Sequence, residues 1–214
     1  MGAARMADHW AREQPWRPGR SLWALYVTCG SIPPLVDHAS QFQEQLSGMR
    51  GLDLVDPRWL HMTVLGVAFT EEVEPAAMDR LVDRVTAIAA AEPPMELVAD
   101  APRARTDAVW MPVSATRPVG PLRDDLEQAV TSCLGRKPHA LPLPREGFRP
   151  HISIAYSNAD APLVDDVDDR LARVDLPPVR FRVSHLSLIR LRREVPRWSW
   201  DAEQRIPFGG TAAP

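Results

Sequence analysis

Two short segments of the sequence carry the same pattern of residue types: a histidine, an apolar residue, a hydroxyl residue and a second apolar residue. They are residues 61–64 (HMTV) and 151–154 (HISI). Side chains alternate between the two faces of a β-strand, so the histidine and the hydroxyl of each segment share a face. Each segment therefore predicts a strand that presents one imidazole and one hydroxyl together on an accessible face.

Two imidazoles and two hydroxyls suit the transfer of a phosphodiester. An imidazole titrates near neutral pH, so one ring can accept a proton from the attacking oxygen while the other donates a proton to the leaving oxygen. The hydroxyls can donate hydrogen bonds to the non-bridging phosphate oxygens, where negative charge develops in the transition state. His61, Thr63, His151 and Ser153 are therefore the predicted catalytic residues. This chemistry requires no metal ion and no cofactor.

A third segment, residues 185–188 (HLSL), repeats the pattern. Chance would produce roughly 0.1 such segments in a chain of this composition, so the repetition is itself a signal. We expect His185 to lie in the middle of a long and largely buried strand, because alternate residues on both sides of it are apolar. By contrast, Pro150 directly precedes His151 and marks the end of a loop. The sequence therefore favours His61 and His151 as the catalytic pair.

The elements that must position these residues are short strands and helices. Apolar runs predict strands at residues 22–28, 59–67, 95–99, 108–113, 151–157, 179–192 and 198–206. Apolar residues at helical spacing predict helices at residues 33–47, 74–91, 118–134 and 162–173. Four prolines between residues 136 and 150 predict a loop that leads into His151. Each of the two histidine strands is thus followed by a helix.

Length and composition limit the class of protein. The 214 residues suit one large domain or two small ones, and 45% hydrophobic residues are typical of a folded chain. No apolar run approaches the roughly 18 residues that cross a bilayer, so a membrane protein is not expected. The 25 basic and 28 acidic residues give a formal net charge of −3. That charge argues against a long groove for duplex nucleic acid, but it permits a short RNA end or a nucleotide.

The N-terminal segment carries several charges and no apolar core, so it does not resemble a signal peptide, and the predicted location is cytoplasmic. We expect residues 1–20 to form an N-terminal tail, either disordered or covering the surface. Residues 21–210 are expected to form a single bilobal domain, and the protein is expected to be a monomer. Cys29 and Cys133 lack metal-binding spacing and are expected to be inert buried thiols.

The two spaced His-apolar-hydroxyl-apolar segments, in a chain of this length, resemble the 2H phosphoesterase superfamily, which includes 2′–5′ RNA ligase-like proteins and cyclic phosphodiesterases. The resemblance covers residues 22–208. It implies an α+β fold with two lobes related by a pseudo-twofold axis, each an antiparallel sheet with outer helices, around a central cleft. It also implies that His61 and His151 are the acid–base pair and that Thr63 and Ser153 bind phosphate. The implied activity is that of a metal-independent phosphodiesterase for a 2′,3′-cyclic phosphate or a 2′–5′ linkage, or of a ligase by the reverse reaction.

Strand alternation also suggests substrate-binding residues. If the two strands extend that far, Trp59 and Arg149 share faces with the histidines that follow them. Trp59 is a candidate for stacking on a base, and Arg149 for binding phosphate oxygens as a planar fork. Tyr156 has the opposite alternation and is predicted to be a core residue. Residues 103–105 lie in a turn whose arginines could reach a phosphate, and residues 141–148 could form a lid.

Two other classes of function remain open at this point. A metal-dependent hydrolase could use His61, His151 and a carboxylate such as Asp56, although hydroxyls two residues after each histidine do not resemble a metal-ligand set. A module that binds RNA or a nucleotide without turnover would use the same residues for recognition only. Activity that survives a chelator would exclude the first class, and formation of a product would exclude the second.

Overall fold

The computed structural model describes residues 4–11, 16, 19–139 and 147–209. In chain order the strands are β1 (Ser21–Thr28), β2 (Leu52–Leu54), β3 (His61–Phe69), β4 (Met95–Ala99), β5 (Arg103–Ala104), β6 (Ala108–Ala115), β7 (His151–Ser157), β8 (Val179–Val183), β9 (His185–Glu194) and β10 (Arg197–Pro207). The helices are α1 (Pro33–Leu46), α2 (Pro75–Ala91), α3 (Gly120–Leu134) and α4 (Val164–Leu171), with 3-10 turns η1 (Pro57–Trp59) and η2 (Thr70–Glu72). The α+β class is confirmed.

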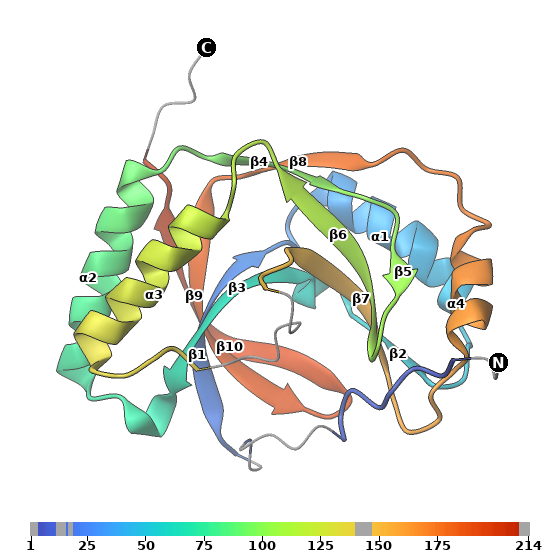
Figure 1. Cartoon of the computed structure of the whole chain (residues 1–214), viewed down its shortest axis with the longest axis horizontal. Helices are drawn as coiled ribbons and strands as arrows, with labels where there is room; N and C mark the ends of the chain where they lie inside the picture. Colours follow the sequence, from blue (N-terminus) through green and yellow to red (C-terminus); the bar gives the residue numbers. More distant parts are fainter. Residues whose placement is uncertain (1–3, 12–15, 17–18, 140–146, 210–214) are drawn as a thin grey trace.

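The strands form a curled antiparallel sheet that divides into two lobes (Figure 1). Its order is β10-β9-β1-β3-β7-β6-β4-β8, with β2 paired to β7 and β5 paired to β6. The two histidine strands, β3 and β7, are neighbours at the centre and pair through Met62 and Ile152. We call β10, β9, β1 and β3 the first lobe, and β7, β6, β4 and β8 the second lobe. The predicted two-lobed arrangement is confirmed, and its two halves meet at the histidine strands.

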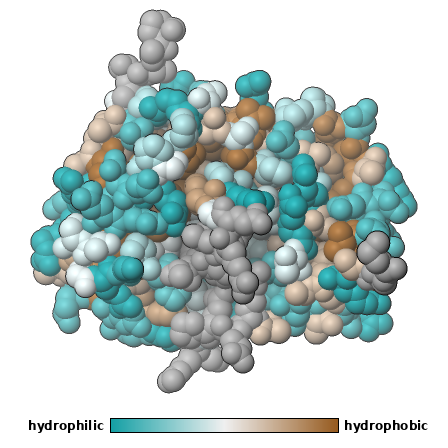
Figure 2. Space-filling model, in the orientation of Figure 1, coloured by the Kyte–Doolittle hydropathy of each residue, from teal (hydrophilic) through white to brown (hydrophobic). Residues whose placement is uncertain are grey.

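The helices cover the lobes from outside. Helices α2 and α3 pack against each other and contact β10 and β3 of the first lobe, while α1 contacts α4 and reaches β7 and β8 of the second lobe. Each long helix buries an apolar stripe, such as Leu81 and Val85 of α2 and Leu122 and Leu126 of α3. Figure 2 shows a mostly hydrophilic surface on the side facing the viewer. Among the described residues, no helix is long and apolar enough to cross a membrane.

The predicted single strand at residues 179–192 is wrong. Strand β8 ends at Val183 and β9 begins at His185, with Ser184 between them. Strand β8 pairs with β4 in the second lobe, whereas β9 pairs with β1 in the first lobe. One straight strand cannot lie in both places, so the chain crosses from lobe to lobe at this break. The short strands β2 and β5 were not predicted, because so few residues show no recognisable alternation.

The described part of the N-terminal segment packs against both lobes. Met6 lies in the main core, between the sheet and the helices. Trp16 lies in a second apolar cluster with Leu22, Ala24, Tyr26, Phe69, Ile189 and Leu191. On β1 the residues of this second cluster alternate with core residues such as Leu25, so the cluster covers the inner face of the first lobe.

Candidate active site

The predicted catalytic residues lie at the junction of the lobes. His61 and His151 are the first residues of β3 and β7, and each precedes a member of the fully buried pair Met62–Ile152. Because strand side chains alternate, the residues on both sides of this pair point to the opposite, accessible face. Both histidines and both hydroxyl residues of the two segments are half-buried there. The antiparallel pairing of β3 and β7 thus brings residues ninety positions apart in the chain to one site.

Both imidazoles are held in the same way. Nδ1 of His61 lies 2.7 Å from the carbonyl oxygen of Trp59, and Nδ1 of His151 lies 2.7 Å from the carbonyl oxygen of Arg149. A carbonyl oxygen only accepts hydrogen bonds, so Nδ1 carries the proton and donates it in both cases. The neutral ring therefore has an unprotonated Nε2, which is the form a general base requires. When Nε2 is protonated, the same ring can act as a general acid.

Burial, hydrogen bonds and nearby charges shift the pKa values of the two imidazole rings. The pKa of His61 is lowered to about 4, chiefly by burial and to a lesser extent by the neighbouring His151, against a rise caused by the hydrogen bond to Trp59. Burial also lowers the pKa of His151, while its hydrogen bond to Arg149 and the charge of Asp107 raise it. The charge of each ring therefore depends on burial and, for His61, on the other ring. A bound phosphate would oppose both effects by favouring the imidazolium.

An aromatic ring from the adjacent strand stacks on each histidine. The ring centres of Tyr26 and His61 are 4.4 Å apart with an interplanar angle of 9°, and those of Trp110 and His151 are 4.4 Å apart at 38°. Tyr26 on β1 pairs with Thr63, and Trp110 on β6 pairs with Ser153, so the two aromatic residues occupy equivalent positions in the two lobes. Sequence reasoning missed both of them, because the register between strands distant in the chain is not visible in the sequence.

A tyrosine also lies near each predicted catalytic hydroxyl. Burial raises the pKa of Tyr26 and of Tyr156, and the neighbouring side chains of Thr63 and Ser153, respectively, oppose that rise. Tyr156 is buried, as predicted, but it does not point away from Ser153 as simple alternation requires. The pairing of β6 with β7 shifts by one residue between Ala155 and Ser153, and this β-bulge returns Tyr156 to the side of the site.

The two predicted substrate-binding residues lie outside the strands, so the alternation argument for them is wrong. Trp59 belongs to η1, and Arg149 precedes β7 without regular structure. Each supplies the backbone carbonyl that holds the following histidine. The ring of Trp59 packs edge-on against Trp200, with their centres 4.6 Å apart, while the Arg149 side chain is exposed. Most of the predicted lid, namely residues 141–146 of 141–148, lies outside the described residues.

The remaining candidates from the sequence are the arginines of the 103–105 turn and the carboxylate of Asp56. In the 103–105 turn Arg103 is exposed, whereas the guanidinium of Arg105 lies 4.9 Å from the centre of the Trp110 ring. Asp56 accepts a hydrogen bond from the backbone of Arg58 and pairs with its guanidinium at 2.9 Å. In the described residues, no group of three or more His, Cys, Asp or Glu side chains is placed to hold a metal ion.

The third His-apolar-Ser segment differs from the other two. His185 begins β9 rather than lying inside a strand, and it is half-buried. Ser187 is fully buried, where it donates to Glu203 at 2.7 Å and lies 3.0 Å from the hydroxyl of Thr28. A hydroxyl with two protein partners is not available to a phosphate, so this segment serves the packing of β9 on β1 and β10.

Comparison with known proteins supports the same reading of the fold. Residues 33–194 match the family model of the 2′-5′ RNA ligase superfamily. TT0787 of Thermus thermophilus is 18% identical with a TM-score of 0.68, covering 89% of this chain and 100% of that chain. E. coli LigT complexed with 3′-AMP is 15% identical with a TM-score of 0.57, covering 87% of this chain and 98% of that chain.

The MHV ns2 PDE domain is 12% identical with a TM-score of 0.50, covering 79% of this chain and 98% of that chain. A comparison with curated protein sequences finds no match. These likenesses support a phosphoesterase type of function at a coarse level, and the structural ones establish the fold. The match over residues 33–194, together with this fold, shows that the chain belongs to the 2′-5′ RNA ligase superfamily, among the 2H phosphoesterases.

Proposed function

We propose that the protein is a metal-independent phosphodiesterase that acts on a 2′,3′-cyclic phosphate or a 2′–5′ linkage, at an RNA end or in a small nucleotide. One observation carries this proposal: two imidazoles, each anchored through Nδ1 and each followed by a hydroxyl residue, flank the residue pair that joins the lobes. Family membership supports the phosphodiester class of substrate. Within that class, the choice of a 2′,3′-cyclic phosphate or a 2′–5′ linkage follows from the resemblance to the 2H phosphoesterase superfamily.

In the proposed reaction each of the two histidines carries out one proton transfer. In hydrolysis, unprotonated Nε2 of one histidine takes a proton from water as the water oxygen bonds to phosphorus. Protonated Nε2 of the other histidine gives a proton to the ribose oxygen as its bond to phosphorus breaks. We assign the first role to His61, because burial lowers its pKa to about 4 and so keeps it neutral, and the second role to His151. The products are a phosphomonoester and a free ribose hydroxyl.

The hydroxyls complete the proposed mechanism. Thr63 and Ser153 would donate hydrogen bonds to the non-bridging phosphate oxygens, and Tyr26 and Tyr156 lie near these hydroxyls. In ligation, a ribose 5′-hydroxyl replaces water as the nucleophile on a 2′,3′-cyclic phosphate. Its oxygen bonds to phosphorus, the bond from phosphorus to the 3′ oxygen breaks as that oxygen is protonated, and a 2′–5′ linkage forms. Structures of LigT complexed with 3′-AMP, ATP and NADP+ support a nucleotide as the ligand of this fold.

A substrate panel tests the proposal. Purified protein is incubated with 2′,3′-cyclic mononucleotides, 2′–5′ dinucleotides and 3′–5′ dinucleotide controls, with and without EDTA. We expect turnover of one of the first two classes, no turnover of the controls, and no effect of EDTA. Loss of activity in EDTA would favour a metal-dependent hydrolase. Binding without any product after long incubation would favour a recognition module.

A further inference from the structure

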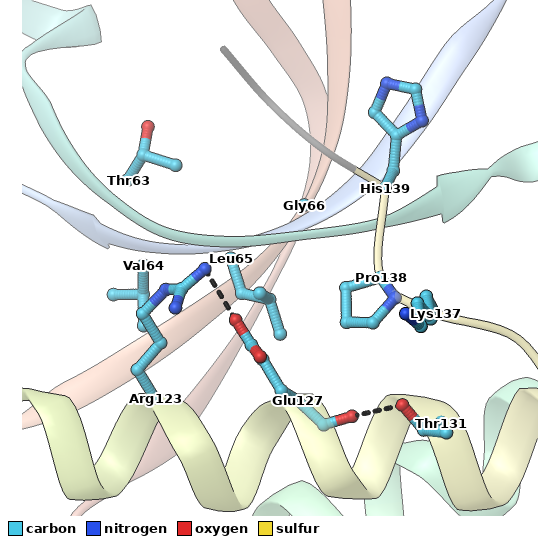
Figure 3. Close-up of a pocket in the computed structure, with 10 residues that line it drawn as sticks. All are labelled: Thr63, Val64, Leu65, Gly66, Arg123, Glu127, Thr131, Lys137, Pro138 and His139. Carbon is cyan, nitrogen blue, oxygen red and sulfur yellow. Dashed lines mark hydrogen bonds and ion pairs between the residues drawn. The ribbon is translucent and has the colours of Figure 1, made fainter. Parts of the chain in front are cut away.

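A pocket beside the catalytic strand has no role in the chemistry described so far. It lies between β3, α3 and residues 137–139, and its volume is about 390 Å³ (Figure 3). It is lined by Thr63, Val64, Leu65, Gly66, Arg123, Glu127, Thr131, Lys137, Pro138 and His139. A volume in this range accommodates a small ligand. Thr63 belongs both to this lining and to the proposed catalytic residues, but Figure 3 shows its hydroxyl on the other side of the β3 ribbon from Arg123 and Glu127. A ligand that reaches the scissile phosphate and Arg123 together must therefore pass over the edge of β3.

The pocket combines an apolar wall with cationic groups. Val64, Leu65 and Pro138 provide apolar surface. Arg123 and Lys137 provide two positive charges, against the single negative charge of Glu127. The lining therefore suits a ligand with a flat apolar part and an anionic part, as in a nucleoside phosphate.

Arg123 is the residue best placed to bind the anion. Its side chain is 16% exposed and pairs with Glu127 on the next turn of α3 at 2.6 Å, as Figure 3 shows. Its buried Nε has no hydrogen-bond partner within the part of the chain that the structure describes. A buried donor without a partner is costly, so this nitrogen has capacity for a further acceptor. The guanidinium also lies 5.2 Å from the ring centre of Phe148, three residues before His151, which links the pocket to both catalytic strands.

We infer that this pocket binds the nucleotide unit next to the scissile phosphate, with the 5′-phosphate of that unit paired to Arg123 and Lys137. The inference rests on the proposed function for the identity of the scissile group. It makes the enzyme selective for RNA ends over single cyclic nucleosides, because only a longer or 5′-phosphorylated substrate supplies the second phosphate. Glu127 competes with that phosphate for Arg123 and so limits the affinity.

The test compares adenosine 2′,3′-cyclic phosphate with and without a 5′-phosphate. We expect the 5′-phosphate to raise kcat/KM of the wild-type protein at least about tenfold, as charge-assisted hydrogen bonds typically would. Arg123→Gln and Lys137→Gln should each bring this ratio towards one, because each lowers kcat/KM mainly for the 5′-phosphorylated substrate. Glu127→Gln should raise the ratio, because it frees Arg123. Arg84→Gln, on the exposed side of α2, is the matched control and should leave the ratio unchanged.

The direction in which each variant changes the ratio of the two kcat/KM values decides whether the inference holds. If Arg123→Gln leaves the ratio of the two kcat/KM values unchanged, the inference is overturned. It is also overturned if the ratio falls equally in all three pocket variants, because that result would indicate a structural role for these residues. If no substrate is turned over, the proposed function fails, and calorimetry of AMP against adenosine tests the pocket alone. A preference for AMP that disappears in Arg123→Gln would support the pocket. Equal binding of both compounds would exclude it.

Discussion

At the scale of single residues, the hydrogen bond from Nδ1 to a carbonyl two positions earlier is the feature that suits the two histidines to the proposed proton transfers. It fixes the ring orientation and leaves Nε2 as the unprotonated nitrogen of the neutral ring. The motifs predicted the histidines and hydroxyls, but not this anchoring. Trp59 and Arg149 were selected for their side chains, yet each also supplies the backbone carbonyl that holds a histidine. Their carbonyl positions depend on the turns before β3 and β7, which side-chain patterns do not report.

The pH dependence of the reaction follows from the lowered pKa values of both histidines. The active form has one neutral and one protonated ring, and kcat/KM reports the free protein. Because burial disfavours the imidazolium, with His61 at a pKa of about 4, we expect a bell-shaped kcat/KM with its maximum below pH 6.5, the ordinary histidine value. Bound phosphate favours the imidazolium, so kcat should reach its maximum at a higher pH. Rate profiles from pH 4 to 9 check this, and a kcat/KM maximum above pH 8 would contradict it.

The contact between Tyr26 and Thr63 predicts coupled effects of substitution. Tyr26→Phe keeps the ring that stacks on His61 but removes the hydroxyl that lies near Thr63. One neutral hydrogen bond is typically worth enough to change a rate about 2- to 12-fold, so we expect a loss of kcat in that range. Thr63→Val should lose more, and adding Tyr26→Phe to it should cost little extra. Additive losses in the double variant would show that the two hydroxyls act independently.

At the scale of elements, periodicity predicted the long helices and most strands because each buries one clear stripe or run. What it could not predict are features that depend on a partner in space. The break at Ser184 arises because β8 and β9 belong to different lobes, and the bulge in β7 redirects Tyr156. The stacking of Tyr26 and Trp110 on the histidines depends on strand register. Each of these is decided by pairing between segments far apart in the chain.

The end of α3 gives a prediction about stability. Gly135 ends the helix with a φ of 64°, in the left-handed region that other residues rarely adopt. Gly135→Ala should lower the free energy of unfolding by about 1 kcal/mol and leave turnover unchanged. Gly120→Ala, at the start of the same helix, is the control, because a Cβ there meets nothing within 4 Å and its φ is not positive. Chemical denaturation of both variants provides the measurement, and equal stability of the two would contradict the assignment.

At the scale of the whole molecule, the N-terminal segment ties the lobes together. The ring of His9 bonds Asp107 of the second lobe at 2.7 Å and accepts a hydrogen bond from Trp198 of the first lobe at 2.8 Å. It also stacks on Tyr156, with ring centres 4.2 Å apart. Trp10 donates to Asp53 beside β7, and its carbonyl accepts from Arg193 on β9. The two lobes are therefore connected at the central strands β3 and β7 and a second time through the N-terminal segment.

Replacing His9 tests this second connection. His9→Ala removes hydrogen bonds to both lobes and one stacked ring, so we expect the free energy of unfolding to fall by about 1–3 kcal/mol. Because His9 stacks on Tyr156, which lies near Ser153, turnover should also fall, while Thr63 and His61 keep their contacts. Denaturation curves and turnover measured on the same samples provide the check. A variant as stable and as active as the wild type would show that the segment only covers the surface.

The most direct test of the two-histidine mechanism is the turnover of three single variants on the best substrate of the panel. His61→Ala and His151→Ala should each lower kcat by 10² or more, since a general acid or base typically contributes about 10²–10⁴. His185→Ala, from the segment whose serine is committed to packing, should lower the melting temperature and keep kcat within about threefold of the wild type. Near-normal turnover by His61→Ala or His151→Ala, or a hundredfold loss in folded His185→Ala, would contradict the mechanism.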